Sequence, residues 1–339
     1  MKPAINAQTA SFESPSPVQD EQRRTSDTAM RPNKNARKRR LSLALQGGGS
    51  FGAFSWGILD RLLDEPDLSF DAISGASAGA LNAVVMASGL HRGGNQGARE
   101  SLHQFWEQVS SAPPAADVIA AMAPASRLVS PYHFNPFNLN PLRAILSELV
   151  DFESLRLSPS VQLLIAATQV SDGKLRIFRE DELTADVALA SSCLPLLHRA
   201  VTIDGVAYWD GGYSANPPLL PLVAASQARE VLLIQLVPTA GSETPTTFDD
   251  IGKRALQITF NTPLMRDLES INSMMRLVAT DGDGSSLSRK LRRLKLHHIK
   301  VETEVPDLAA ASALDRGWEF LLQLRSAGRH AAEKWVSGL

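Results

Sequence analysis

Short apolar runs alternate with segments of helical spacing along most of the chain. Apolar runs at 41–45 and 70–74 predict strands, and the segments 53–63 and 78–88 that follow them carry apolar residues at helical intervals. A repeated strand–helix order is typical of a sheet with mainly parallel strands and helices on its faces. We therefore predict an α/β fold with a mainly parallel central sheet flanked by helices.

Further runs extend this pattern towards the C-terminus. Strands are predicted at 161–168, 175–178, 201–203, 206–209, 231–236 and 296–301. Asp172-Gly173 and Asp204-Gly205 each separate two of these strands, and an Asp-Gly step between apolar runs is a strong signal for a hairpin turn. Additional helices are predicted at 97–109, 141–150, 248–277 and 312–335.

The chain divides into a polar tail and one folded domain. Residues 1–38 have hardly any large apolar side chains, so they cannot bury enough surface to offset the entropy of ordering. We predict a disordered polar and basic tail at 1–38 and a single domain at 39–339. Within the domain, the residues at about 91–160 are interpreted as a helical insertion. Its Pro- and Asn-rich loop at 131–141 is expected to cover part of a site.

Composition narrows the class of protein. Of the 339 residues, 44% are hydrophobic and 21% are charged, which is typical of a globular protein. A formal net charge of −2 gives no indication of a nucleic-acid partner. The single cysteine, Cys193, excludes an internal disulfide and a cysteine-cluster metal site, and the histidines lack ligand-like spacing. We therefore expect no metal and no cofactor.

Two basic segments bear on membranes. The segment 31–40 contains no acid, and 288–295 interleaves basic residues with leucines. The segment 31–40 indicates attraction to an anionic membrane or to nucleic acid, and 288–295 indicates contact with anionic lipid. An ordinary solvated segment is the alternative for each, and we favour it for both. No run approaches the ~18 apolar residues of a membrane span, and no signal peptide is recognised. We expect a cytoplasmic or peripheral membrane protein, and the sequence indicates no oligomeric state.

The segment Gly75-Ala76-Ser77-Ala78-Gly79 carries the first chemical signal. It matches G-x-S-x-G and lies between a predicted strand and a predicted helix, which is the setting of a nucleophile elbow. The start of the helix directs its partial positive charge towards Ser77. These residues predict a nucleophilic serine, although a tight turn without chemistry has the same pattern.

The glycine run Gly47-Gly48-Gly49, with Gly52 after it, carries the second signal. Glycines after a strand expose successive backbone N–H groups, which can stabilise the oxyanion formed in acyl transfer. A phosphate-binding loop is the competing interpretation, but the Lys and Ser/Thr of that motif are absent. A dinucleotide loop is disfavoured because the serine elbow stands where a ribose-binding acid is expected.

The third signal is Asp210-Gly211-Gly212, at the end of the predicted strand 206–209. An attacking serine needs a base, and a carboxylate within hydrogen-bond reach can provide it. Two glycines after the aspartate allow the chain to turn close to the site. Taken alone, the segment is more typical of an ordinary Asp-Gly turn.

Together, in this order, the three motifs resemble the signature of patatin-like phospholipases. The resemblance runs from about Leu41 to Leu236. It includes the segment Ala190–Pro195, and Asn216 and Pro217 after the aspartate motif. It implies a three-layer sandwich fold. One departure is Phe51, where many family members carry Arg or Lys.

The resemblance implies the roles of the site residues. Ser77 would attack the ester carbonyl, Asp210 would act as the base, and the Gly47–Gly49 backbone would hold the oxyanion. The implied activity is that of a lipid acyl hydrolase, a phospholipase A or a lysophospholipase or esterase, working through an acyl-enzyme. Its substrate is a lipid or another ester.

Several alternatives remain open. The same dyad serves acyltransferases and thioesterases, and a non-catalytic lipid-binding module belongs to a different class. A triad that includes His198 is the alternative to the dyad, because His198 precedes the aspartate motif. Phe134, Phe137 and Leu139 are candidates to line an acyl pocket, and ordinary packing residues would show the same pattern.

Overall fold

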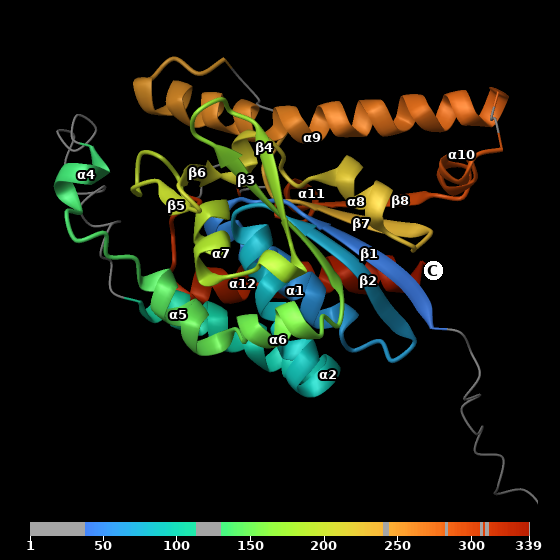
Figure 1. Ribbon diagram of the computed structural model, residues 1–339, viewed down its shortest axis with the longest axis horizontal. Coiled ribbons are helices and arrows are strands. Elements are labelled where there is room, and N and C mark those ends of the chain that lie inside the picture. Colours follow the sequence, from blue (N-terminus) through green and yellow to red (C-terminus); the bar gives the residue numbers. More distant parts are fainter. Residues whose placement is uncertain are drawn as a thin grey trace, which may run out of the picture. The chain divides into compact units, whose positions relative to one another are not determined.

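An eight-stranded sheet lies at the centre of the part of the chain that the structure describes (Figure 1). This computed structural model describes residues 38–112, 130–239, 244–281, 284–305, 308 and 312–338. The tail predicted at 1–38, except Lys38, lies outside the described residues, as does the middle of the predicted insertion. The residues from Lys38 onward form one compact unit.

The sheet is mainly parallel, as the sequence predicts. Its strands are β1 (Arg39–Leu45), β2 (Leu68–Gly75), β3 (Gln162–Gln169), β4 (Leu175–Arg179), β5 (Val201–Ile203), β6 (Val206–Asp210), β7 (Glu230–Gln235) and β8 (Lys295–Lys300). Their order is β5-β6-β3-β2-β1-β7-β8, with β4 paired to β3. The pairs β1–β2, β1–β7, β2–β3 and β7–β8 are parallel, whereas β3–β4, β3–β6 and β5–β6 are antiparallel.

Both predicted hairpins are confirmed. Gly173 has a φ of +71° in the turn between β3 and β4. Asp204 and Gly205 have φ values of 49° and 79° between β5 and β6. Positive φ at both central residues is what a two-residue turn needs to match the twist of its strands, and Asp-Gly adopts it readily.

Helices cover both faces of the sheet, which gives three layers. The helices are α1 (Gly52–Leu62), α2 (Ala78–Ser111), α4 (Pro131–Phe134), α5 (Pro141–Leu149), α6 (Phe152–Leu157), α7 (Ala185–Ser191), α8 (Leu219–Ala225), α9 (Phe248–Asp281), α10 (Ser286–Leu291), α11 (Val301–Glu304) and α12 (Trp318–Ser337). Leu43 and Leu45 of β1 join the core under α1, α2 and α12, whereas Ala44 joins the core under α8 and α9. Figure 1 shows α9 on one side of the sheet and α1 and α12 on the other. The predicted α/β architecture is therefore confirmed.

A kink divides α2 between its two predicted halves. Gly93 and Gly94 have non-helical backbone angles, and Gly94 has a φ of 58°. The sequence predicts separate helices at 78–88 and 97–109, so the break falls where their apolar pattern stops. The first half of α2 begins at the predicted serine elbow, and the second half packs into the same core as the first.

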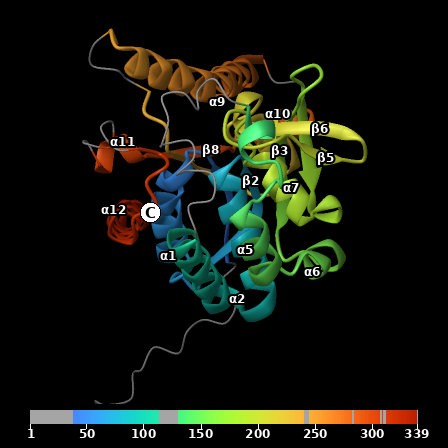
Figure 2. The same cartoon turned by 90° about the vertical axis from the view of Figure 1, so that its left-hand side faces the viewer.

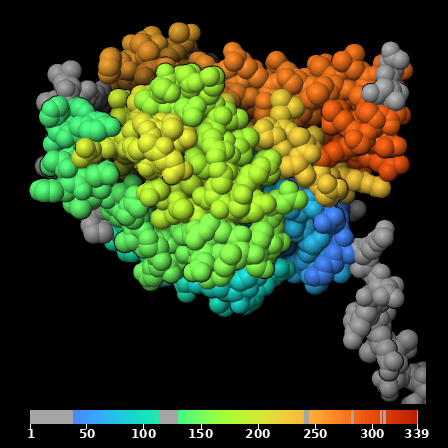
Figure 3. Space-filling view, viewed as in Figure 1, coloured from blue at the N-terminus to red at the C-terminus, as the bar shows by residue number. Residues whose placement is uncertain are grey.

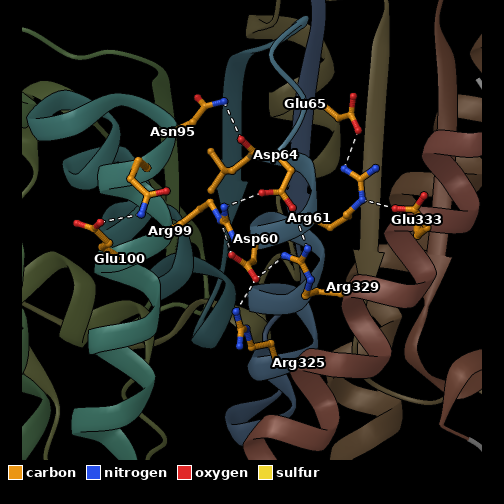
Figure 4. Close-up of polar contacts among 12 residues, drawn as sticks. Asp60, Arg61, Asp64, Glu65, Asn95, Arg99, Glu100, Arg325, Arg329 and Glu333 are labelled. Carbon is orange, nitrogen blue, oxygen red and sulfur yellow. Dashed lines mark hydrogen bonds and ion pairs between the residues drawn. The ribbon is translucent and has the colours of Figure 1, made fainter.

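A buried carboxylate fastens the last helix to the first. Asp60 of α1 forms ion pairs with Arg99 of α2 at 2.8 Å and with Arg325 and Arg329 of α12 at 2.7 and 2.6 Å (Figure 4). The Asp60 side chain is 2% exposed. Burial acts to raise the pKa of Asp60, but the hydrogen bonds from the three arginines outweigh it and lower that pKa. The cluster holds α12 against the core. It thereby also fixes the position of the segment directly before α12.

None of the helices in the described ranges is both long enough and apolar enough to span a membrane.

Candidate active site

Ser77 lies in a sharp turn between β2 and α2. The strand ends at Gly75, the helix begins at Ala78, and Ser77 between them has φ 53° and ψ −127°. Its N–H donates to the carbonyl and the hydroxyl oxygen of Ser191, at 3.0 and 3.1 Å. Positive φ in a residue with a side chain costs on the order of 1–3 kcal/mol and persists only where the surroundings impose it. The strain therefore marks Ser77 as a candidate functional residue.

The glycine loop lies against this turn because β1 and β2 are parallel neighbours whose carboxyl ends share one edge of the sheet. A Cβ atom on Gly47 would come within 2.6 Å of the Ser77 Cβ, so only glycine allows the two segments to approach this closely. The Gly47 N–H donates to Asn216 Oδ1 at 2.7 Å. That N–H group is therefore already engaged, and Gly47 positions the loop.

The next two N–H groups of the loop are available. No acceptor for the N–H of Gly48 or Gly49 is found among the described residues. Gly49 has a φ of +58°, and it lines the same cavity as Ser77. The following amide, that of Ser50, donates to the carbonyl of Ala313 at 2.8 Å, which fixes the far side of the loop. Backbone N–H groups without an acceptor are candidates to stabilise an oxyanion.

Strand register brings Asp210 to the same place. Gly75 of β2 pairs with Ile165 of β3, and two residues further on Ala167 pairs with Asp210, the last residue of β6. Asp210 is 0% exposed. Its Oδ1 accepts from the Gly212 N–H at 2.7 Å, whereas Oδ2 has no hydrogen-bond partner among the described residues. A buried carboxylate oxygen without a donor is unusual and needs an explanation.

The electrostatics of Asp210 suit a base. Burial raises the pKa of Asp210 to about 7, against the opposing effects of the Gly212 N–H and of the Ser77 hydroxyl. The serine hydroxyl is thus near enough to act on the carboxyl, although Oδ2 makes no well-aligned hydrogen bond. A general base works best when its pKa lies near the working pH, and such pKa values gather at functional sites.

A cavity of about 160 Å³ opens beside Ser77. Figure 2 faces the side of the molecule on which α2, α5 and α7 lie, and these helices and the segments beside them supply most of its walls. The apolar walls include Leu81, Phe105, Val109, Ile145, Leu194 and Leu197. An apolar cavity of roughly 150 Å³ holds a molecule the size of benzene. The cavity therefore suits a short stretch of acyl chain.

The other glycines of the motifs mark close approaches of the backbone. A Cβ on Gly79 would lie 2.1 Å from the carbonyl oxygen of Leu45, and one on Gly211 would lie 2.2 Å from that of Ala166. A Cβ on Gly75 would lie 2.6 Å from the backbone of Gly79, and Cβ atoms on Gly52 and Gly212 would lie 2.8 and 2.5 Å from the side chains of Ala78 and Phe260. These glycines let α1, α2 and the aspartate turn pack tightly around the site.

The other residues that the sequence singled out lie in different places relative to the cavity. His198 lines the cavity together with Ser77. Phe51, at the position where the family often has a cation, is 7% exposed and meets Phe320 edge to face at 6.5 Å. It belongs to the core and does not face the cavity. Phe134, Phe137 and Leu139 are not among the described residues that line the cavity.

The positioning role of Asn216 was not predicted from the sequence. Asn216 is 0% exposed, accepts from the Gly47 N–H through Oδ1, and donates through Nδ2 to the carbonyl of Phe260 at 3.2 Å. It thus joins the glycine loop, the aspartate segment and α9. A buried asparagine has four hydrogen-bonding groups to satisfy, so its place six residues after Asp210 was a usable signal.

Gln46, directly before the glycine run, is a second residue of this kind. Its Oε1 accepts from the N–H groups of Leu236 and Val237 at 2.7 and 2.8 Å, and its Nε2 donates to Asn261 at 3.0 Å. The end of β1 is thereby fixed to the end of β7. Both residues hold the loop that carries the two available N–H groups.

Comparison with known families assigns the chain to one of them. The sequence model of a family described as patatin-like phospholipase matches residues 43–223, which is more than half of the chain. The chain belongs to the patatin-like phospholipase family. The resemblance drawn from the serine, glycine and aspartate motifs is thus confirmed, and membership of the patatin-like family implies lipid acyl hydrolase activity. Comparison with curated proteins finds no match.

Two solved structures match the chain at low sequence identity and low structural similarity. VipD from Legionella pneumophila is 15% identical, with a TM-score of 0.36, and the match covers 86% of this chain and 67% of that chain. A chain of the heterodimeric ExoU–SpcU complex from the type III secretion system of Pseudomonas aeruginosa is 18% identical, with a TM-score of 0.28. That match covers 87% of this chain and 68% of that chain.

Proposed function

We propose that the protein hydrolyses an acyl ester of a lipid through a catalytic dyad of Ser77 and Asp210. One observation carries the proposal: a fully buried carboxyl with an unpartnered oxygen lies beside a serine in a strained turn. An ordinary Asp-Gly turn has no reason to hide an unpaired oxygen, because burial without a partner costs stability. In a hydrolase, that oxygen receives the serine proton.

The reaction proceeds in two halves. Asp210 takes the proton of Ser77 Oγ as this oxygen attacks the ester carbonyl, and the carbonyl oxygen becomes an oxyanion between the N–H groups of Gly48 and Gly49. The tetrahedral intermediate collapses, Asp210 gives the proton to the leaving alcohol, and the acyl group stays on Ser77. Water, deprotonated by Asp210, then attacks the acyl-enzyme. The fatty acid leaves and Ser77 regains its proton.

The cavity favours the acyl chain as the part of the substrate that is held. Its walls are apolar, and its volume of about 160 Å³ is small for a long chain, which must extend towards the opening. Phospholipase A, lysophospholipase and esterase activity all fit this arrangement. Acyl transfer and thioester hydrolysis use the same two residues and differ in the acceptor or the leaving group.

The approach to the cavity fits contact with a membrane surface. Phe137, Leu139 and Leu196 are 83%, 60% and 82% exposed. Leu139 directly precedes the lining residue Asn140, and Leu196 lies between the lining residues Leu194 and Leu197. A hydrogen bond of 3.0 Å from Arg199 to the carbonyl of Pro136 joins the two segments. Large apolar side chains gathered beside a lipid site indicate peripheral docking on a bilayer.

Hydrolysis of p-nitrophenyl butyrate tests the dyad. Wild type should hydrolyse the ester, while Ser77→Ala and Asp210→Asn should lose at least 10³-fold in kcat, with unchanged circular dichroism. His198→Ala should keep most of the activity. A folded His198→Ala variant as inactive as Ser77→Ala would replace the dyad by a triad, and equal activity in wild type and Ser77→Ala would refute the assignment of the nucleophile.

A second experiment tests the membrane contact. Phe137→Ser combined with Leu196→Ser should lower the rate of phospholipid hydrolysis on zwitterionic vesicles several-fold and leave kcat/KM for p-nitrophenyl butyrate unchanged. The matched control is Leu157→Ser, because Leu157 is 77% exposed and does not line the cavity. An equal loss in the control, or no loss in the double variant, would contradict docking through these residues.

A further inference from the structure

A second cavity, of about 470 Å³, lies at the opposite edge of the sheet. Arg229, which lines it, directly precedes β7, and its carbonyl accepts the N–H of Lys295 at the start of β8. The active site lies at the carboxyl ends of the parallel strands, whereas this cavity lies at their amino ends. In Figure 1, α10 is on the side where β1 begins, and α5 and α7 lie towards the other side.

Four cationic side chains line this cavity: Arg229, Arg289, Lys290 and Arg293. They come from the end of the loop before β7 and from α10 and the turn after it. Figure 3 shows the two segments as neighbours on the surface, with the yellow residues before β7 beside the orange α10. No carboxylate is among the described lining residues, although the whole chain has a net charge of −2.

The three arginines have no ion-pair partner among the described residues. Asp71 lies behind the cavity, acts on the charge of Lys290, is 6% exposed and is engaged through both carboxylate oxygens. Its Oδ1 pairs with Arg40 at 3.0 Å, and its Oδ2 accepts from the Ser226 hydroxyl and the Ala228 N–H at 3.1 Å. The cavity therefore concentrates positive charge, and no described carboxylate forms an ion pair with its three arginines.

Packing holds the backbone of α10, which carries two of the cations. Leu291 and Leu294 are 2% and 6% exposed, so they fix α10 and the turn after it to the core. Lys290 donates to the carbonyl oxygens of Ala224 and Ser226, which ties α10 to the end of α8. The backbone that carries these side chains is therefore fixed, whereas the side chains of Arg229, Arg289 and Arg293 are exposed to a ligand from solvent.

We propose that this cavity binds a multiply phosphorylated anion. Arginine forks match phosphate oxygens in pairs, and three arginines with a lysine suit two or more phosphate groups better than one carboxylate. The hydroxyl of Ser286 lines the same cavity and offers a further donor. The site is separate from the serine and aspartate and does not depend on their chemistry. A phosphorylated lipid headgroup and a free polyphosphate share the recognised chemistry.

Titration with inorganic tripolyphosphate in 150 mM NaCl tests the site. The test variant combines Arg229→Gln with Arg293→Gln, and the charge-matched control combines Arg266→Gln with Arg276→Gln, two exposed positions of α9. Calorimetry should show binding by wild type and by the control, and at least tenfold weaker binding by the test variant. No binding by wild type, or an equal loss in the test and control variants, would overturn the proposal.

A second arm separates the two sources of phosphate. Sedimentation with phosphatidylcholine vesicles that contain a phosphorylated phosphatidylinositol should capture wild type but not the test variant if the ligand is a lipid headgroup. The ligand is instead soluble if the test variant loses tripolyphosphate binding while wild type does not bind the vesicles. The same holds if both proteins bind the vesicles equally. Hydrolysis of p-nitrophenyl butyrate at the wild-type rate by the test variant shows that its fold and its other site are intact.

Discussion

Replacing Asp210 with asparagine should abolish activity and, at neutral and alkaline pH, stabilise the protein. The substitution keeps the size and shape of the side chain and removes its charge. Asp210 is fully buried, and its Oδ2 has no partner among the described residues. The ionised carboxylate is therefore a cost to the folded state, because burial penalises the charged form.

The magnitude follows from the pKa of Asp210, which is about 7 in the folded chain against 3.8 in the unfolded chain. A carboxyl with a raised pKa keeps its proton in the folded state while the unfolded state releases it. Stability is therefore complete below pH 3.8 and is lost as the pH rises towards 7, by about 1.4 kcal/mol per pH unit. The total loss is about 4 kcal/mol, of which about 2–3 kcal/mol falls between pH 5 and pH 8.

Urea unfolding of wild type and Asp210→Asn at pH 5, 6, 7 and 8 measures this loss. The difference in the free energy of unfolding between the two proteins should grow by about 2–3 kcal/mol across the series, in favour of the asparagine variant. Packing effects of the amide are the same at every pH, and all other titrating groups are shared, so only the slope matters. The rate constant kcat/KM of wild type should rise with pH through the same region, since the base must be ionised.

Ser77→Ala is the control, because it removes the nucleophile and keeps the titrating carboxyl. Its stability should follow that of wild type with pH. A difference between wild type and Asp210→Asn that stays constant from pH 5 to pH 8 would refute the reasoning, since it would mean that the pKa of Asp210 is not raised. A difference that shrinks with pH would reveal a cationic partner in the folded state.

Three further predictions concern the residues that shape the site. Asp60→Asn should lower the free energy of unfolding in urea by about 2–3 kcal/mol. This loss is smaller than that of breaking a fully buried ion pair, because the arginines around Asp60 reach water. The control Asp64→Asn, at a more exposed carboxylate, should cost under about 1 kcal/mol. Asn216→Ala should leave the Gly47 N–H without its acceptor, costing about 1–3 kcal/mol and lowering kcat for p-nitrophenyl butyrate more than it changes KM; an unchanged kcat would dismiss a positioning role. Ser77→Gly should have a free energy of unfolding in urea about 1 kcal/mol higher than that of Ser77→Ala, because glycine accepts a positive φ. The reverse order would show that the turn is not strained.

The strands were predictable because their apolar runs are continuous, as expected of strands buried on both faces. Their ends were less so: β1 begins at Arg39, two residues before its apolar run, because Arg39 and Arg40 pair with Glu230 and Asp71. The helices α6, α7 and α8 were not predicted. They have six or seven residues each, too few to show helical periodicity. Packing stabilises them: α7 and α8 contact the sheet, whereas α6 contacts α2.

For the site, the sequence indicates which residues carry the chemistry but not their state. Ser77 and Asp210 are 133 positions apart, and only the register of β2, β3 and β6 brings them together. The raised pKa of Asp210 arises from burial, which no local pattern encodes. Gly47 was expected to contribute to the oxyanion hole, but its N–H is held by Asn216. Whether a backbone donor is available depends on its tertiary partners and not on the glycine itself.

The site contains two unfavourable features, a serine with positive φ and a buried carboxyl with an unpaired oxygen. Each lowers stability, so each persists only because the surrounding structure is fixed elsewhere. The loop between β1 and α1 is tied to β7 by Gln46 and to the aspartate segment by Asn216. The segment before α12 closes its far side and is anchored by the arginines around Asp60. Loosening these anchors should therefore relax the strained turn and reduce catalysis before the protein unfolds.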